Sequence, residues 1–351
     1  MKTEIIRAKS NHIEEEELKR AAQILKNGGL VAFPTETVYG LGGDALNISA
    51  AGKIYGAKGR PSDNPLIVHI ADLNALEELT DGCPENGMKL ANAFWPGPLT
   101  LIFRKNSKVP GSTTGGLDTV AIRMPSHPVA LELIKASGLY IAAPSANLSG
   151  RPSPTNAQHV IEDMSGVIDM IIDGGKVDIG LESTIVDLTG SIPTVLRPGF
   201  ITVEMLEAVV GEVAVDQVVV ARSADPGLIP KAPGMKYKHY APKGELTIYE
   251  GEDEAVVKAI NEAAKELVLK GYKTGIIATK ETYNNYPLGT VKVIGTREDE
   301  KTIARGLFEV LRDFDTEGME YIFAESFDNQ RLGQAIMNRM LKAAGYHVIK
   351  V

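Results

Sequence analysis

Residues 33–42 read FPTETVYGLG and directly follow a short apolar run. The run predicts a buried strand, and Pro34 ends it because a prolyl nitrogen cannot donate a ladder hydrogen bond. The glycines that follow allow a backbone to approach a ligand closely. Thr-Glu-Thr on its own would favour an ordinary strand-to-helix turn with a capping threonine. Within the full ten-residue string, we instead predict a ligand-facing loop over residues 34–43.

Two common nucleotide motifs are excluded. Residues 40–45, GLGGDA, formally match the relaxed dinucleotide fingerprint G-x-G-x-x-A, but that motif needs its first glycine directly after a strand. Here six residues intervene, one of them a proline. The phosphate-loop pattern G-x-x-x-x-G-K-[ST] does not occur either, so any ATP would be held without a P-loop.

Outward from this stretch, apolar patterning predicts short strands that alternate irregularly with helices. Expected strands are residues 30–33, 66–70, 99–103, 120–124, 140–143, 170–172, 184–188 and 194–196. Expected helices are residues 14–26, 50–57, 73–80, 88–94, 128–136 and 155–163. This mixture favours a strand-rich α/β fold over a regular βαβ repeat.

A chain of 351 residues exceeds the usual size of one hydrophobic core, so two domains are expected. Periodicity lapses into prolines and glycines over residues 213–243, which we interpret as a linker. Regular alternation then resumes: strands 246–249, 274–278, 291–294, 321–324 and 347–351, with helices 254–269, 302–314 and 332–344. The predicted organisation is a first domain over 1–212, the linker, and a smaller Rossmann-like α/β domain over 244–351.

Residues 58–61 read KGRP and follow an expected helix. Lys58 and Arg60 could grip two phosphates of one triphosphate, Arg60 as a planar fork and Lys58 as a point charge. Basic residues at a solvated helix end are the alternative.

The strand at 140–143 ends in small residues and continues as PSANLSG. Ser145 and Asn147 would point the same way if that segment stays extended. Small side chains before them suit a backbone that packs against a nucleotide, and a plain Asn/Ser turn is the alternative.

Two further side chains end apolar strands. His69 is, by default, a hydrogen-bonded histidine at the edge of the core. Arg123 within an apolar strand needs an anion, either a structural carboxylate or a ligand carboxylate, and we favour the ligand. Ser183 starts a strand and Arg197 follows one, so we expect both on the rim of the fold.

Composition narrows the class of protein. The net charge of −8 argues against broad binding of nucleic acid through its phosphates. The single cysteine, Cys83, excludes an internal disulfide and Cys-rich metal sites, and no histidine pair has zinc-ligand spacing, so we expect no bound metal. A charged amino terminus and the lack of a long apolar run predict a cytoplasmic protein.

The order and spacing of these motifs resemble the YrdC-like threonylcarbamoyl-adenylate synthases in their long, two-domain form. Lys-x-Arg together with Ser-x-Asn is the signature pair of that family, and residues 232–242, APGMKYKHYAP, resemble its linker motif. The resemblance implies a YrdC-like twisted mixed sheet with flanking helices in the first domain, followed by the Rossmann-like domain. One departure is Lys238, where relatives commonly have arginine.

The resemblance also implies site residues. Threonine would be surrounded by Thr37, His69, Arg123, Ala143 and Ser183. ATP would be held by Lys58, Arg60, Asn64, Thr119, Ser145, Asn147, Ser153, Arg197 and a linker tyrosine, Tyr237. Lys58 and Arg60 would be the catalytic pair, stabilising charge on the phosphoryl oxygens and the leaving pyrophosphate.

The implied enzyme is an adenylyltransferase that makes threonylcarbamoyl-AMP and pyrophosphate from ATP, bicarbonate and L-threonine, as the first step of threonylcarbamoyladenosine formation in tRNA. Mg²⁺ would arrive on ATP. The product would pass to a downstream tRNA threonylcarbamoyltransferase, with weak or no direct tRNA binding. The linker, carrying Tyr237 and His239, would cover the pocket as a lid.

Two alternatives remain. An RNA-binding module is disfavoured by the acidic charge and the lack of a basic stripe. The carbamoyl-transfer step of hydrogenase maturation also uses a YrdC-like domain, but those proteins carry Cys-rich zinc modules that a chain with one cysteine cannot form.

Overall fold

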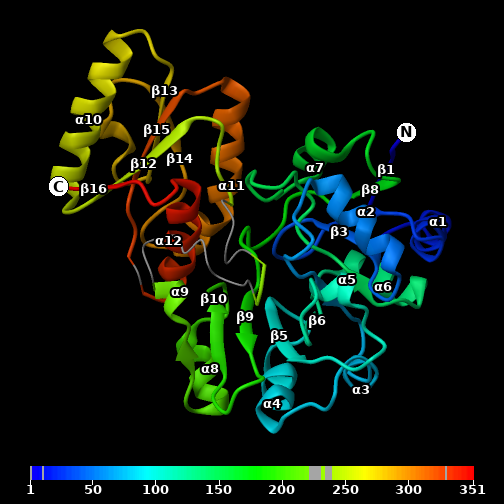
Figure 1. The fold of residues 1–351 in the computed structure, drawn as a ribbon. Helices are drawn as coiled ribbons and strands as arrows, with labels where there is room; N and C mark the ends of the chain where they lie inside the picture. Colours follow the sequence, from blue (N-terminus) through cyan, green and yellow to red (C-terminus); the bar gives the residue numbers. More distant parts are fainter. Residues whose placement is uncertain (1, 10–11, 221–230, 234–238, 329) are drawn as a thin grey trace.

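The computed structural model describes residues 2–9, 12–220, 231–233, 239–328 and 330–351. Within these residues the chain forms two sheets, each with its own helices (Figure 1). The predicted fold class, a large mixed sheet followed by a smaller Rossmann-like unit, is confirmed.

The first sheet mixes parallel and antiparallel pairs. Its strand order is β1 (Glu4–Arg7), β8 (Met170–Asp173), β2 (Val31–Phe33), β3 (Gly40–Asp44), β7 (Ile141–Ala142), β4 (Ile67–His69), β6 (Thr119–Arg123), β5 (Leu99–Arg104), β9 (Thr184–Asp187), β10 (Thr194–Arg197) and β11 (Ala214–Val215). Its helices are α1 (Glu15–Lys26), α2 (Ile48–Lys58), α3 (Ala75–Leu79), α4 (Glu85–Phe94), α5 (Gly111–Thr114), α6 (Pro128–Ser137), α7 (Ala157–Met164), α8 (Val203–Val210) and α9 (Gln217–Val220).

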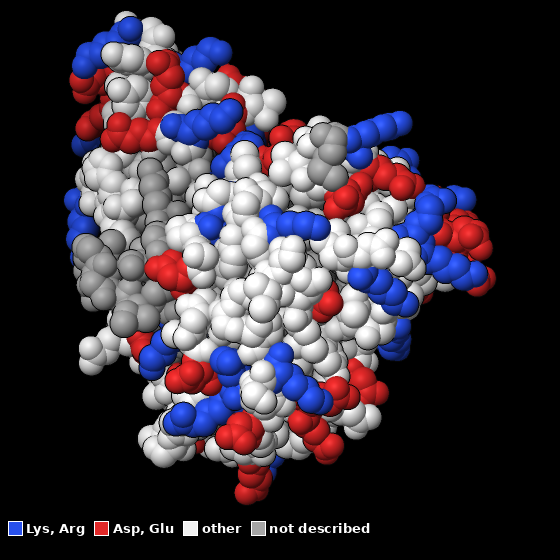
Figure 2. Space-filling view, turned by 45° about the vertical axis from the view of Figure 1, so that its right-hand side comes forward, with Lys and Arg blue, Asp and Glu red and all other residues white. Residues whose placement is uncertain are grey.

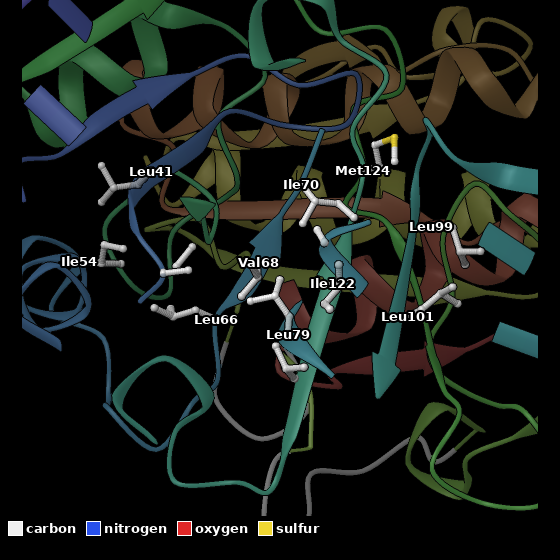
Figure 3. Packing of buried hydrophobic residues seen from close by; sticks show 14 of the residues in the cluster. Leu41, Ile54, Leu66, Val68, Ile70, Leu79, Leu99, Leu101, Ile122 and Met124 are labelled. Carbon is white, nitrogen blue, oxygen red and sulfur yellow. The ribbon is translucent and has the colours of Figure 1, made fainter. Parts of the chain in front are cut away.

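Leucine, isoleucine and valine side chains from the central strands form the main core of this domain. Val68, Ile122 and Leu101 on three neighbouring strands pack together, with Leu79 of α3 beneath them (Figure 3). The apolar runs that predicted these strands are therefore buried on both faces of the sheet.

The predicted loop over residues 34–43 is wrong in its second half, because Gly40–Asp44 forms the buried strand β3, antiparallel to β2. A Cβ at Gly42 would lie 2.7 Å from the Phe33 ring, and one at Gly43 would lie 3.1 Å from Ile54. Glycines thus fill a crowded strand here, and the loop between β2 and β3 is confined to residues 34–39.

The second sheet is entirely parallel, in the order β14 (Thr290–Val293), β13 (Thr274–Ala278), β15 (Tyr321–Glu325), β12 (Glu245–Glu250) and β16 (Val348–Lys350). α10 (Asp253–Leu269) packs on one face, while α11 (Glu300–Glu317) and α12 (Arg331–Ala343) cover the face toward the first domain (Figure 1); η1 (Tyr283–Asn285) is a single short turn. The regular alternation predicted each of these strands and long helices to within a few residues.

The two domains share a hydrophobic contact. Val38 and Leu181 of the first domain belong to the same buried cluster as residues of α11 and α12. Gly180 lies at this contact with φ +84°, and a Cβ there would lie 2.6 Å from the Cα of Arg305. Only glycine allows the two backbones to approach this closely.

The segment interpreted as a linker begins inside the first sheet, since β11 pairs parallel with β10 and α9 follows it. Residues 221–230 and 234–238, and with them Tyr237 and Lys238, lie outside the described residues. No helix in the described parts of the chain is both long and apolar enough to cross a membrane.

Candidate active site

A cavity opens beside the carboxyl ends of β4 and β6, where loops from both halves of the chain meet. Four arginines, three serines, two threonines and two histidines are among the residues that line it. The lining residues include Thr35, Thr37, Arg60, His69, Arg123, Ala143, Ser145, Asn147, Arg151, Ser153, Glu182, Ser183, Arg197, Pro233, His239 and Tyr240.

Sheet register explains part of this convergence. His69 and Arg123 are the last residues of β4 and β6 and are direct register partners. Because parallel strands end at the same edge of a sheet, both side chains reach the same cavity. All five residues predicted to surround threonine, namely Thr37, His69, Arg123, Ala143 and Ser183, line it.

Arg123 is buried and already has an anion within the protein. One guanidinium nitrogen lies 2.7 Å from Oε1 of Glu36, and Nη1 donates to Oγ1 of Thr37 at 2.9 Å. We had favoured a ligand carboxylate as its partner, and the structure instead supplies the structural carboxylate. Since Arg123 also lines the cavity, it could contact a ligand as well.

Burial lowers the pKa of His69 to about 3, with Arg123 adding to the effect. The imidazole is therefore neutral near pH 7, and its Nδ1 lies 3.2 Å from the carbonyl oxygen of Ile67. A neutral imidazole next to a cation adds hydrogen-bonding capacity without further positive charge.

Ser183 and Arg197 are buried within the fold, so the rim position expected for both is wrong. Arg197 ends β10 and donates through Nε to the carbonyl oxygen of Ser183 and through Nη2 to its hydroxyl, at 3.1 and 3.2 Å. Its Nη1 donates to the carbonyl oxygen of Pro233. Sequence reasoning missed this because β9 and β10 pair antiparallel, which brings Arg197 back over the start of β9.

Lys58 and Arg60 are buried, which excludes the solvated helix end as their setting. Helix α2 begins at the Asn47 cap and ends where Gly59 adopts a left-handed conformation, φ 59°. That turn directs the chain inward after the last helical residue, since glycine reverses it without steric cost.

Lys58 lies behind the cavity wall rather than in it. Its ammonium donates to the carbonyl oxygens of Ser145 and Asn147, at 2.5 and 2.6 Å. Burial, and then Arg60, lower the pKa of Lys58 well below its usual range. The lysine thus ties α2 to the loop that carries the Ser-x-Asn motif.

Arg60 lines the cavity, and its guanidinium donates to the carbonyl oxygens of Asn64 and Pro65. Burial lowers the pKa of Arg60 and of Arg197 to about 10, so both remain charged at neutral pH. The Oδ1 atom of Asn64 is buried and accepts no hydrogen bond from the described residues, and the residue itself lies behind the lining.

Ser145, Asn147 and Ser153 line the cavity, as predicted for an ATP-binding loop. The Asn147 amide donates to the carbonyl oxygens of Leu148 and Arg151, which holds the loop in a compact turn. Thr119 does not line the cavity, because it starts β6 at the end opposite Arg123. Its role in ATP binding, like that of Tyr237, remains a prediction.

Comparisons with known proteins indicate the same family for both domains of the chain. The family described as Telomere recombination matches residues 23–199, and the family described as Threonylcarbamoyl-AMP synthase, C-terminal domain, matches residues 201–345. The threonylcarbamoyl-AMP synthase of Pyrococcus abyssi is 49% identical over 339 residues, covering 97% of each chain. That of Bacillus subtilis is 50% identical over 335 residues, covering 95% of this chain and 94% of the other.

The chain belongs to the threonylcarbamoyl-AMP synthase family.

The solved structure of P. abyssi Sua5 complexed with L-threonine superposes with a TM-score of 0.93 at 48% identity. The match covers 99% of this chain and 100% of the other. The resemblance inferred from the motifs, including the long two-domain form of these synthases, is confirmed.

Several residues that shape this synthase-family cavity were not singled out from the sequence. Glu36 pairs with Arg123, Glu182 accepts from the hydroxyl of Ser153 at 2.5 Å, and Arg339 of α12 donates to Glu182. No local motif marks Arg339, because the contact joins residues 157 positions apart. The sequence offered one signal, because Arg339 is a charged residue on the otherwise apolar face of a predicted amphipathic helix.

The described residues contain no group of three or more His, Cys, Asp or Glu side chains that could hold a metal ion. The cavity's carboxylate, Glu182, is engaged by Ser153 and Arg339. On the face shown in Figure 2, basic and acidic side chains are interspersed around a largely uncharged centre, without a continuous basic band.

Proposed function

We propose that this protein makes threonylcarbamoyl-AMP and pyrophosphate from ATP, bicarbonate and L-threonine. The names of relatives that match nearly the full chain support the product, and the threonine complex of P. abyssi Sua5 supports the amino acid. As an adenylyltransferase, it would supply the first step of threonylcarbamoyladenosine formation in tRNA.

One observation of the structure carries this proposal: Arg60, Arg123, Arg151 and Arg197 line one cavity together with hydroxyl groups and a neutral imidazole. Guanidinium groups are suited to phosphate and carboxylate oxygens, which they bind as planar forks. A site with this composition favours two anionic ligands side by side.

Threonine fits the part of the cavity at the ends of β4 and β6. Arg123 would receive its carboxylate, while Thr37 and Ser183 offer hydroxyl groups and Ala143 leaves room for a methyl group. His69 stays neutral there, so it does not repel the amino group. The amine must be neutral to react, and a site rich in cations favours its deprotonated form.

ATP would occupy the side formed by Arg60, Ser145, Asn147, Ser153 and Arg197, and Asn64, Thr119 and Tyr237 complete the proposed set. Lys58 acts from behind, because it fixes the carbonyls of Ser145 and Asn147. Of the pair expected to be catalytic, Arg60 lines the cavity and remains the proposed catalytic residue, whereas Lys58 would position the loop that carries Ser145 and Asn147.

Two bond-forming steps account for the reaction. The neutral amine of threonine adds to carbon dioxide formed from bicarbonate, giving a carbamate with net loss of water. A carbamate oxygen then attacks the α-phosphorus of ATP, and the bond from that phosphorus to the bridging oxygen of pyrophosphate breaks. The protein positions both substrates and stabilises the charge that moves onto pyrophosphate.

Mg²⁺ would arrive on the triphosphate, since the described residues offer it no cluster of carboxylates. The linker with Tyr237 would cover the cavity and slow hydrolysis of the carbamate and the product. We further propose a cytoplasmic location and transfer of the product to a tRNA threonylcarbamoyltransferase, without strong tRNA binding by this chain itself.

Measuring pyrophosphate release while omitting one component at a time tests the function. Release should require ATP, bicarbonate and L-threonine together, and other amino acids should not replace threonine. Release that persists without bicarbonate would contradict the proposed carbamate.

A further inference from the structure

The two largest fully buried side chains among the described residues are arginines of the second domain, Arg312 on α11 and Arg339 on α12. Burying a guanidinium is costly unless its donors find acceptors. Both arginines find them in the first domain, at loops that border the cavity. They therefore cross the domain contact at the active site.

Within the described residues, the hydrogen bonds that Arg339 donates beyond α12 end at a cavity residue or next to one. Its Nε donates to Oε2 of Glu182 at 3.0 Å, and its Nη2 donates to the carbonyl oxygen of the same residue at 3.2 Å. Its Nη1 donates to the carbonyl oxygen of Pro198 at 2.6 Å, directly after Arg197.

Glu182 transmits this contact to the cavity lining. While one carboxylate oxygen accepts from Arg339, the other accepts from the Ser153 hydroxyl at 2.5 Å. Burial acts to raise the pKa of Glu182, but Arg339, Arg197 and the Ser153 hydroxyl outweigh it, so the pKa lies below its usual value. Glu182 therefore stays ionised and keeps two fixed partners.

Arg312 makes a parallel contact on the other side of Ser153. It donates to the carbonyl oxygen of Pro152 at 2.7 Å and to Asp163, which also binds Arg151 and the backbone of Leu148. Two separate helices of the second domain thus hold the loop from residue 148 to residue 153.

Hydrophobic packing already joins the domains through Val38, Leu181 and the apolar faces of α11 and α12. Adhesion alone does not require a buried guanidinium, since well-packed apolar side chains at such sites are often at least as stabilising. Arg339 adds hydrogen bonds, which are directional. They fix the position of the Glu182 carboxylate, and that carboxylate in turn fixes the Ser153 hydroxyl.

We propose that Arg339 is a positioning residue of the second domain that acts through Glu182 to hold Ser153 in its ATP-binding arrangement. The assignment of ATP to that side of the cavity rests on the proposed function. It gives the second domain a role in the reaction without contact between Arg339 and the substrates.

The test compares the full-length protein with Arg339→Met, Glu182→Gln and the double variant. Pyrophosphate release should show a KM for ATP raised about tenfold or more in each single variant, with the KM for threonine changed less than about threefold. The double variant should be no worse than Glu182→Gln, because residues that act through one contact are non-additive.

Arg305→Met is the matched control. Arg305 also reaches from α11 to the first domain, where its Nε donates to the carbonyl oxygen of Asp178, but it lies at the exposed edge and away from the cavity. Its KM values should stay within about twofold of wild type. Arg339→Lys keeps the charge without the fork, and it should fold with an intermediate KM for ATP if Arg339→Met is unstable.

Additive losses in the double variant, or a lowered unfolding midpoint with an unchanged KM for ATP, would overturn the proposal and leave Arg339 a purely structural residue. Calorimetric titration of ATP into the same variants separates this inference from the function. If the wild type binds ATP but releases no pyrophosphate with threonine and bicarbonate, the proposed function fails. A weakened ATP affinity in Arg339→Met would still support the inference.

Discussion

The carboxylate of Glu36 lies 2.7 Å from the guanidinium of Arg123, and both side chains are buried at the wall of the cavity. Removing one member of a buried ion pair leaves the other charge uncompensated, at a cost of about 3–5 kcal/mol. Glu36 therefore keeps the charged guanidinium of Arg123 in place, where the carboxylate of a ligand could also bind it.

Glu36→Gln should lower the free energy of unfolding by about 3 kcal/mol, because Arg123 keeps its charge and loses its partner. L-threonine should then raise the melting temperature more in the variant than in the wild type, since the ligand carboxylate replaces the missing one. Glu4→Gln, which breaks the exposed pair with Arg20, is the control and should change little. Equal threonine-induced shifts in both proteins would show that Arg123 does not meet the ligand.

Lys58→Met should reduce pyrophosphate release by about a hundredfold, because the Ser145–Asn147 loop loses the ammonium that holds two of its carbonyls. Lys53→Met provides the comparison, since Lys53 on the same helix donates to the carbonyl oxygen of Gly28, away from the cavity. Steady-state kinetics on both variants distinguish the two. Comparable losses of activity in the two variants would mean that the position of α2, and not the hold of Lys58 on the Ser145–Asn147 loop, determines the rate.

Gly180→Ala should destabilise the contact between the domains, because its methyl group would overlap the backbone of Arg305. Gly138→Ala has a similar left-handed backbone, φ +62°, but open space around the added carbon. The control should cost about 1 kcal/mol from the backbone alone, and Gly180→Ala distinctly more. Chemical denaturation measures both, and equal costs would argue against a tight interdomain approach.

Acid should destabilise the fold through His69. Its pKa is about 3 in the folded protein and about 6.5 when unfolded, so the unfolded state binds more protons between these values. Stability is thus fully retained above about pH 6.5 and falls as the pH drops toward 3, by up to about 1.4 kcal/mol per pH unit for this group.

His69→Gln should flatten the decline in unfolding free energy between pH 6 and about pH 4. An unchanged slope in His69→Gln would place the acid sensitivity at other buried histidines, such as His159, whose pKa burial also lowers to about 3.

Periodicity predicted the second domain well because its parallel strands are continuous apolar runs separated by long amphipathic helices. It missed β3, since Gly40, Gly42 and Gly43 indicate a turn by composition yet lie in a crowded strand. Whether a glycine forms a turn or fills a crowded strand depends on the side chains packed against it. For β3 these include Phe33 and residues of α2, which the local sequence does not reveal.

For the site, short motifs identified Arg60, Ser145, Asn147 and Arg197, which the structure brings to one cavity. The acceptors of Arg60, Asn147 and Arg197 could not be read from the sequence, because they are backbone carbonyls and, for Arg197, also the hydroxyl of Ser183. Lys58 binds carbonyls 87 and 89 residues away, and nothing in its local sequence specifies them.

The pairing of Arg339 with Glu182 sets an order of events during synthesis. Glu182 leaves the ribosome 157 residues ahead of its partner, a delay of roughly 8–30 s at typical elongation rates. Throughout that interval the first domain lacks the guanidinium that pairs with Glu182 across the domain contact. If Arg339 positions Ser153 as proposed above, the ATP side of the cavity is completed only once α12 has been synthesised, so a chain truncated before residue 339 should bind ATP more weakly than the full-length protein.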